Sequence, residues 1–266
     1  MKRLIVLLSF ITFSTVLAEG PSFDNLTNTD LDNISKEFSA NFVHRAVSPA
    51  STLGDIFGFE VGLIAGITDA PDIAAITQRE DPTNTDPFDK IAHAGLYGSV
   101  SVPFGITAEL VLLPEQDLGD VSISHTSFGL KWTFSKYLPI PMVDLAIKGH
   151  FSSSEMSFSD TVDSVTTTVS LENSTMGATL LGSVNLLVFE PFVGIGYVTR
   201  DTDLTASGTA QIFDSSFTLN QAGSVDGSSS QVLAGVQVNL LIMKIAAQYE
   251  NVFGTSVTSA KLTFGF

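Results

Sequence analysis

Hydrophobic and polar residues alternate with period two along most of the chain beyond residue 56. The stretch 57–67 has Phe, Phe, Val, Leu, Ala and Ile at every second position, with mostly small or polar residues between them. Successive side chains on a β-strand point to opposite faces, so this alternation predicts strands with one apolar face and one small or polar face. Further segments of this kind predict about ten strands; they cover 96–102, 106–113, 121–134, 143–151, 176–184, 191–197, 231–239, 244–252 and 258–266.

Short and long connections alternate between these predicted strands. The short ones are 103–105, 135–141, 185–187 and 240–242, and the long ones are 69–92, 114–120, 159–165, 201–229 and 254–256, although the last has only three residues. Within the first long connection, Pro71 to Gln78 predicts one or two helical turns. An even number of antiparallel strands returns the C-terminus to the side on which the first strand begins. This pattern is typical of a closed antiparallel barrel.

The composition indicates a membrane protein that crosses the bilayer with strands. Hydrophobic residues make up 44% of the 266 residues, charged residues 15%, and the mean hydropathy is +0.32. No apolar run beyond the N-terminus reaches the roughly 20 residues that a spanning helix needs. Lys2 and Arg3 precede an apolar run, and Val16-Leu17-Ala18 resembles a cleavage site, which predicts a signal peptide over 1–18.

The last strand resembles the closing strand of bacterial outer-membrane β-barrels. In Val257–Phe266 one face carries Ala260, Leu262, Phe264 and Phe266, and the chain ends on an aromatic residue. The resemblance implies an all-β fold: a closed antiparallel transmembrane β-barrel of about ten strands, with the long loops outside the cell. It also implies that Phe264 and Phe266 belong to the signal read by the barrel assembly machinery. The expected location is the outer membrane, among lipids and lipopolysaccharide.

Residues 19–55 come before the barrel, which we expect to span 56–266. Leu31, Ile34, Phe38 and Phe42 follow a roughly helical spacing, which predicts a short amphipathic helix over about residues 30–40. One interpretation is a flexible leader. The other is a plug that docks at the periplasmic mouth of the barrel and narrows its lumen, as the apolar stripe requires a partner. In this second form the chain resembles a shortened hydrophobic-compound channel with an N-terminal plug.

The polar face of the strands supplies the candidate lumen lining. These residues carry charges of both signs, and buried charges must pair or stay hydrated. They therefore fit either a salt-bridged interior that holds the barrel shut or a narrow, charged, water-filled path. The predicted inward residues are Glu60, Tyr97, Glu109, His125, Lys131, Asp144, Lys148, His150, Lys244, Gln248, Glu250 and Lys261.

Charge and missing motifs exclude several function classes. The formal net charge of −16 argues against a nucleic-acid partner. The chain has no cysteine, which excludes disulfides, thiol nucleophiles and thiolate metal sites. No nucleotide-binding or zinc-binding spacing is present, so we expect no cofactor and no metal. The acidic residues of the predicted outer loops, densest around Asp81, Asp86 and Asp89, are interpreted mainly as solvated charges, with divalent-ion binding as the alternative.

Three function hypotheses follow. The first is a narrow pore or transporter for small solutes, with apolar solutes included because of the resemblance to hydrophobic-compound channels. The second is a structural or surface-interaction barrel that binds a partner through its acidic outer loops. The third and weakest is a lipid hydrolase: His125-x-Ser127 and His150-x-Ser152 are similar to the His-x-Ser pair of outer-membrane lipid A deacylases, but the rest of that motif is missing. An aspartyl protease of the omptin type would need paired Asp and Asp/His side chains near the outer rim, and the predicted outer loops do not supply them. We therefore expect a protein that is not an enzyme.

Overall fold

The computed structural model describes residues 28–54, 56–80, 89–118, 121–135, 141–162, 165–212 and 215–265. The predicted signal peptide, most of the acidic cluster at 81–89 and the terminal Phe266 lie outside these residues. The helices are α1 (Asn28–Phe42), α2 (Pro71–Glu80) and the 3-10 turn η1 (Pro103–Gly105). The strands are β1 (Gly58–Asp69), β2 (Lys90–Val102), β3 (Ile106–Leu118), β4 (Val121–Thr133), β5 (Val143–Val162), β6 (Val165–Val184), β7 (Phe189–Ile212), β8 (Ser215–Leu240), β9 (Met243–Val252) and β10 (Thr255–Gly265).

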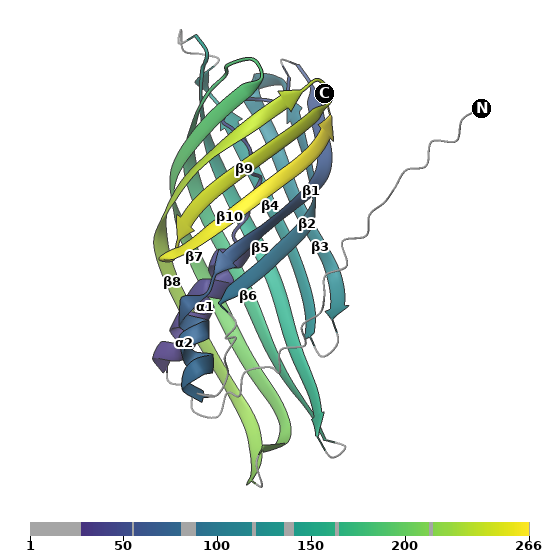
Figure 1. Ribbon diagram of the computed structural model, residues 1–266, viewed down its shortest axis with the longest axis vertical. Helices are drawn as coiled ribbons and strands as arrows, with labels where there is room; N and C mark the ends of the chain where they lie inside the picture. Colours follow the sequence, from purple (N-terminus) through teal and green to yellow (C-terminus); the bar gives the residue numbers. More distant parts are fainter. Residues whose placement is uncertain are drawn as a thin grey trace, which may run out of the picture.

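The ten strands form a closed antiparallel barrel, which confirms the predicted fold class (Figure 1). Each strand pairs with its neighbours in the chain, and β1 pairs with β10 to close the barrel, with Leu63 opposite Leu262. Closure pairs the backbone of both terminal strands and leaves no free edge over their length. The predicted helical turns in the first long connection are also confirmed, because α2 occupies it.

The outer face of the barrel is apolar, as the alternation predicted. Leu130 is 50% exposed, Val193 61% and Leu262 40%, whereas their neighbours Lys131 and Lys261 are each 2% exposed. Large exposed side chains of this kind recur on all ten strands, including the aromatic residues Phe128, Trp132 and Phe264. A closed barrel satisfies its own backbone hydrogen bonds, so an apolar exterior of this extent suits contact with lipid.

Three segments expected to be loops are mainly β-strand. The predicted loops at 114–120, 159–165 and 201–229 belong largely to the hairpins β3–β4, β5–β6 and β7–β8, and the β7–β8 ladder continues to Ile212 opposite Ser215. The prediction was wrong because it required an apolar face, whereas strand pairing needs only a partner backbone. Thr and Val are also favoured in strands even where both faces are polar.

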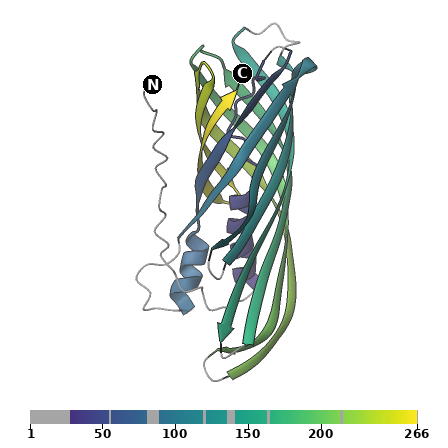
Figure 2. The ribbon, with the colours of Figure 1, turned by 90° about the vertical axis from the view of Figure 1, so that its right-hand side faces the viewer.

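The two ends of the barrel differ. At one end, called the turn end here, lie the short connections and the C-terminus of β10; at the other, the hairpin end, lie α2 and the hairpin connections. The hairpins β5–β6 and β7–β8 have strands of 20 to 26 residues and project beyond the rest of the barrel wall (Figures 1 and 2). β9 and β10 have only 10 and 11 residues, so the wall is much lower on their side.

Candidate functional site

The inside of the barrel is occupied by residues 28–54, which we call the plug. Its helix α1 lies toward the hairpin end, and residues 43–54 run through the interior to the turn end, where β1 begins (Figures 1 and 2). Every residue from Glu37 to Ala50 is buried. Docking inside the barrel was expected, but the expected position of the helix at the mouth beside the short turns was wrong. The reason is that residues 43–54, which form neither helix nor strand, are long enough to run from α1 through the barrel to β1.

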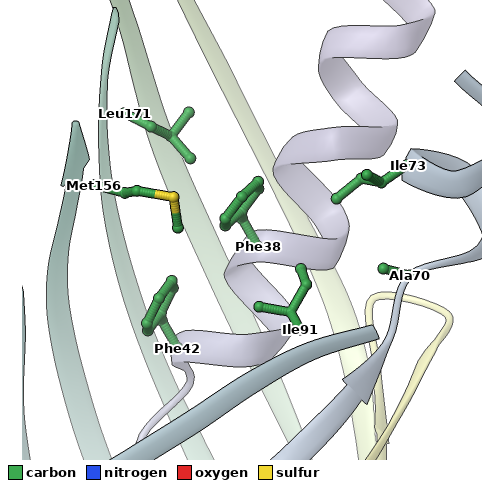
Figure 3. Packing of buried hydrophobic residues seen from close by; sticks show 7 residues of the cluster. All are labelled: Phe38, Phe42, Ala70, Ile73, Ile91, Met156 and Leu171. Carbon is green, nitrogen blue, oxygen red and sulfur yellow. The ribbon is translucent and has the colours of Figure 1, made fainter. Parts of the chain in front are cut away.

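At the hairpin end, α1 packs through its apolar stripe. Phe38 and Phe42 contact the inward-facing Met156 of β5 and Leu171 of β6 on one side (Figure 3). On the other side the same cluster includes residues at the ends of β1 and β2 and on α2, namely Ala70, Ile73 and Ile91. Ile34 packs against this cluster, whereas Leu31 is only partly buried and is not among its members.

The adjoining face of α1 is polar and contacts polar wall residues. Ser35 Oγ donates a hydrogen bond to Thr202 Oγ1 (2.7 Å), and Ser39 Oγ donates one to Asn173 Oδ1 (2.6 Å). Arg200 of β7 forms an ion pair with Asp32 (2.5 Å) and donates a hydrogen bond to Ser35. The helix is therefore fixed in rotation, with one face in an apolar cluster and the other on a hydrogen-bonding wall.

Glu37 joins α1 to α2. Its carboxylate accepts hydrogen bonds from the backbone N–H groups of Asp72 (2.7 Å) and Ile73 (2.9 Å) in the first turn of α2. The first N–H groups of a helix have no partner within the helix, and Pro71 at its first position lacks one, so Glu37 caps α2 from another element. Burial raises the pKa of Glu37, the two N–H donors lower it, and the nearby Asp72 raises it, with a net shift upward.

Arg45 fixes the point where the helix ends. Its guanidinium donates hydrogen bonds to the backbone carbonyls of Ala40 and Asn41, which are among the last carbonyls of α1. The same group pairs with Glu250 of β9, with Nε 2.9 Å from Oε2. Glu250 also accepts hydrogen bonds from Gln231 and Gln248. A cation suits a helix C-terminus, so Arg45 serves both as a cap and as an attachment to the wall.

Glu109 of β3 is the centre of the middle level. Its carboxylate accepts a hydrogen bond from Ser48 Oγ (2.9 Å), lies 3.3 Å from His44 Nε2, and is within 3.8 Å of the ammonium groups of Lys131 and Lys148. All of these side chains are buried. One carboxylate thus contacts two plug side chains and lies close to two lysines of the wall.

The wall approaches the plug closely at this level because β4 has glycine there. A Cβ atom on Gly129 would lie 2.5 Å from His44 Nε2 and 3.0 Å from Glu109 Oε2. Atoms in ordinary contact do not come this close. Gly129 therefore makes room for His44.

Near the turn end the wall holds the backbone of the plug. Lys131 Nζ donates to the carbonyls of Pro49 (2.7 Å) and Ser51 (3.0 Å), and Thr133 Oγ1 donates to that of Ala50 (2.6 Å). An extended segment has no internal partners for its carbonyls, so the wall must supply them. A second ionic group lies beside it: Glu60 contacts Lys261 (2.9 Å) and Lys244 (3.4 Å).

The structure places the predicted lumen residues inside the barrel, but in separate groups. One group surrounds Glu109 with Lys131 and Lys148, and another joins Glu60, Lys244, Lys261 and Tyr97, whose ring lies under the Lys261 ammonium. Gln248 and Glu250 face Arg45. Asp144 is only partly buried and accepts a hydrogen bond from Ser135. His125 and His150 are buried, and His150 has no hydrogen-bond partner on either ring nitrogen among the described residues.

Sequence reasoning missed the polar half of the plug. His44, Arg45 and Ser48 form its ionic and hydrogen-bonded attachments, yet only the apolar stripe was predicted to dock. A signal was present: an Arg lies three residues beyond the last residue of the amphipathic stripe, while the predicted interior contains Glu60, Glu109 and Glu250, which need partners. Arg200, Asn173 and Thr202 were missed because they lie in segments taken as loop or left unassigned.

One arrangement resembles a catalytic triad in its distances. Ser127 Oγ lies 2.9 Å from His44 Nδ1, and His44 Nε2 lies 3.3 Å from Glu109 Oε2. Ser127 and His44 are each 1% exposed. The predicted His-x-Ser pairs do not form this contact: Ser152 bonds to Thr175 instead of His150. In the described part of the chain, no group of three or more His, Asp or Glu side chains is arranged to hold a metal ion, and no helix is long and apolar enough to cross a membrane.

A closed barrel with an apolar exterior and an ionic interior defines the class of outer-membrane β-barrel proteins. Residues 72–266 match a family of unknown function, DUF6588, and the chain belongs to this family. The match begins at α2, so the plug and β1 lie outside it. No curated protein sequence matches the chain.

Solved structures with a similar fold are outer-membrane barrels. Ail, the attachment invasion locus protein of Yersinia pestis, is 13% identical over 80% of this chain and all of its own, with a TM-score of 0.36. The outer membrane protease OmpT from Escherichia coli is 11% identical over 82% of this chain and all of its own, with a TM-score of 0.45. The translocator domain of the autotransporter NalP from Neisseria meningitidis is 12% identical over 80% of this chain and 88% of its own, with a TM-score of 0.46. At these identities the likeness concerns the fold alone.

Proposed function

We propose that this protein is an outer-membrane channel for small solutes that its own N-terminal plug holds closed. The observation that carries the proposal is the chemistry of the contact between plug and wall. From Arg45 to Leu53 the plug is held by ion pairs and hydrogen bonds to the inner face of the barrel, with Glu109, Glu250 and Lys131 as the main wall partners. When the plug leaves, these groups can be hydrated, so the wall would line a water-filled path.

A barrel whose interior served only to stabilise the fold would have less need of charged groups inside it. A buried ion pair stabilises a fold no more than well-packed apolar residues in its place, because each charge loses its hydration. The interior has apolar clusters around α1 and also around Val47 and Ala50, but its middle and turn end carry charged side chains as well, namely Glu60, Glu109, Lys131, Lys148 and Lys261. This wall chemistry supports polar rather than apolar solutes. The expected orientation puts the hairpin end outside the cell.

Conductance in planar bilayers tests the channel proposal. The chain beginning at Glu19 should be mostly closed, and a variant that lacks residues 19–49 should conduct through open channels. Removal of residues 19–41 alone should have a smaller effect, because His44 to Leu53 stay in the barrel. Removal of 19–27, which precede α1, is the matched control and should change nothing. A folded 19–49 deletion that conducts no better than the complete chain would overturn the proposal.

We also propose that the protein is not an enzyme. The Ser127–His44–Glu109 arrangement is buried at the contact between plug and wall, and a serine nucleophile needs a substrate carbonyl within reach of its hydroxyl. A fluorophosphonate probe that labels activated serines should leave the folded protein unmodified. Labelling that disappears in the variant Ser127→Ala would contradict this.

A second candidate function is supported by the projecting hairpins. β5–β6 and β7–β8 extend beyond the wall as a polar sheet that a barrel serving only as a pore does not require. In this alternative the sheet contacts a partner or lipopolysaccharide outside the cell. Replacement of residues 205–222 by a two-residue Asn-Gly turn keeps Leu204 opposite Gly223 and should then abolish binding of purified lipopolysaccharide while the barrel still folds. Unchanged binding would remove this candidate.

A further inference from the structure

A cavity remains at the turn end with the plug in place. Its volume is about 180 Å³. On one side it is lined by residues 48–53 of the plug. On the other side it is lined by inward-facing side chains of β1, β2, β3, β7, β8 and β9 and by Lys131 of β4. The charged residues that line it are Glu60, Glu109, Lys131, Glu190 and Lys244. Since a water molecule takes up about 30 Å³ in the liquid, this is space for a handful of waters or for a small solute.

Four of the five charges have a counter-charge within the protein. Glu60 pairs with Lys244 and Lys261, and Glu109 pairs with Lys131. Glu190 on β7 differs. It is only 2% exposed and accepts a hydrogen bond from Ser183 Oγ at 2.8 Å, but among the described residues no cationic side chain lies within ion-pair distance of it.

The neighbours of Glu190 along the wall are neutral amides. Gln237 of β8 is directly opposite Glu190 in the β7–β8 register, and its Nε2 donates to Asn239 Oδ1 (2.9 Å). Asn239 is in turn opposite Lys244 of β9, whose ammonium lies 3.4 Å from Glu60. The nearest lysine along this row is therefore engaged by another carboxylate. A buried carboxylate without a counter-charge is costly, which leaves a place for a cation from outside.

We propose that this cavity binds a small organic cation, a primary ammonium or guanidinium solute, with Glu190 as the residue that takes its charge. The N–H groups of such a cation can donate to the carboxylate of Glu190 and to the amide oxygens beside it, which makes charge-assisted hydrogen bonds. A hard divalent ion fits less well, because Ca²⁺ takes six to eight oxygen ligands, and no three acidic side chains converge here among the described residues. The site exists with the plug in place, so it does not depend on whether the barrel conducts.

Calorimetric titration of the chain in lipid nanodiscs tests the proposal. Ethylammonium is the probe, and ethanol and acetate are the neutral and anionic controls of similar size. We expect saturable binding of ethylammonium, at least tenfold weaker binding in Glu190→Gln, and no binding of ethanol or acetate. Glu172→Gln makes the same charge change at an exposed position on β6 and should bind as the unaltered protein does.

Glu190→Asp keeps the charge and should retain part of the affinity, which separates recognition of charge from disturbance of the fold. Heat-modifiable mobility on gels shows which variants are folded. If Glu190→Gln does not fold, the comparison of ethylammonium with ethanol and acetate on the unaltered chain still tests whether the cavity binds a cation selectively. Absence of ethylammonium binding, equal binding of all three probes, or equal affinity in Glu190→Gln would overturn the proposal and leave water as the occupant.

Discussion

Glu109 illustrates, at the scale of single residues, how this interior is balanced. It accepts from Ser48 and His44 of the plug and faces Lys131 and Lys148 of the wall. Removal of one partner of a buried ion pair is far more costly than replacement of the whole group, because it leaves an unpaired charge. A few carboxylates thus link the plug to the wall, in addition to the apolar clusters that Phe38, Val43, Val47 and Ala50 form with wall residues.

Gly129→Ala should push the plug away from the wall. The added Cβ would lie 2.5 Å from His44 Nε2, so His44 must move and the plug is expected to lose about 1–3 kcal/mol of stability, as in other overpacked cores. Limited proteolysis near Phe42 should become faster.

The matched control for Gly129 is the same substitution in the chain that lacks residues 19–49. There His44 is absent and only the Glu109 carboxylate stays close to the added Cβ, so the free energy of unfolding should change much less. An equal loss of stability in both backgrounds would show that strand β4 itself, and not the plug, requires glycine.

Leu130→Arg tests the assignment of the neighbouring outward face. Leu130 is 50% exposed on the apolar exterior, and an arginine near the middle of the bilayer costs about 2–4 kcal/mol. Unfolding by urea in liposomes measures the loss, with Leu130→Ala as the control for removal of the side chain. A cost no larger than that of the alanine variant would contradict the assignment. We expect the same substitution at the buried, inward-facing Gln237 or Thr263 to cost less.

At the scale of elements, the plug and α2 form one unit through Glu37. α2 lies in the β1–β2 connection, yet its first turn is capped by a side chain from α1. Short isolated helices are marginally stable in water, so α2 should depend on this contact and on the apolar cluster around Ile73.

Glu37 should make the α1–α2 contact sensitive to pH. Because its pKa is raised in the folded protein, its contribution to stability is fully present below the ordinary value of 4.5 and declines as the pH rises through the raised pKa. Glu37→Gln keeps an acceptor but never ionises, so this decline should disappear. The measurement is the protection of the Ile73 amide against hydrogen exchange, corrected for the intrinsic rate at each pH. A decline that persists unchanged in Glu37→Gln would assign it to another group.

At the scale of the whole molecule, closure of β1 on β10 converts a sheet into a barrel. The register pairs Val61 with Phe264 and Leu63 with Leu262, so the last strand must be in place before the first loses its free edge. In this order of assembly the residues 28–54 must already lie inside when the barrel closes, or enter it afterwards along its axis.

Deletion of Phe266 should lower the yield of closed barrel in cells and leave the stability of assembled barrels nearly unchanged. Phe266 lies outside the described residues, and the expectation rests on the resemblance of the closing strand to those read by the assembly machinery. The ratio of heat-modifiable to unfolded protein in outer-membrane fractions measures it. Substitution Thr258→Ala, on the same face but far from the terminus, is the control. An unaltered yield after deletion would contradict the expectation.

The sequence by itself determined the class, the strand number and the two faces of the wall. Alternation with period two is a local property, and a shift of one residue reverses the faces, so Leu130 and Lys131 could be assigned to outside and inside from their positions alone. The apolar stripe of α1 could also be predicted locally. Ile34, Phe38 and Phe42 recur at helical spacing, and an apolar face of this kind requires a partner to pack against.

Only the tertiary structure decided what these faces meet. The length of the hairpins depends on pairing between strands, which has no local signature where both faces are polar, as in the β7–β8 hairpin beyond Arg200. The position of the plug depends on contacts between residues 65 and 205 positions apart, such as the hydrogen bond between His44 and Glu109 and the ion pair between Arg45 and Glu250. Such pairs form only when the barrel brings strands from both ends of the chain around one segment, and for that reason charge and spacing along the sequence did not reveal them.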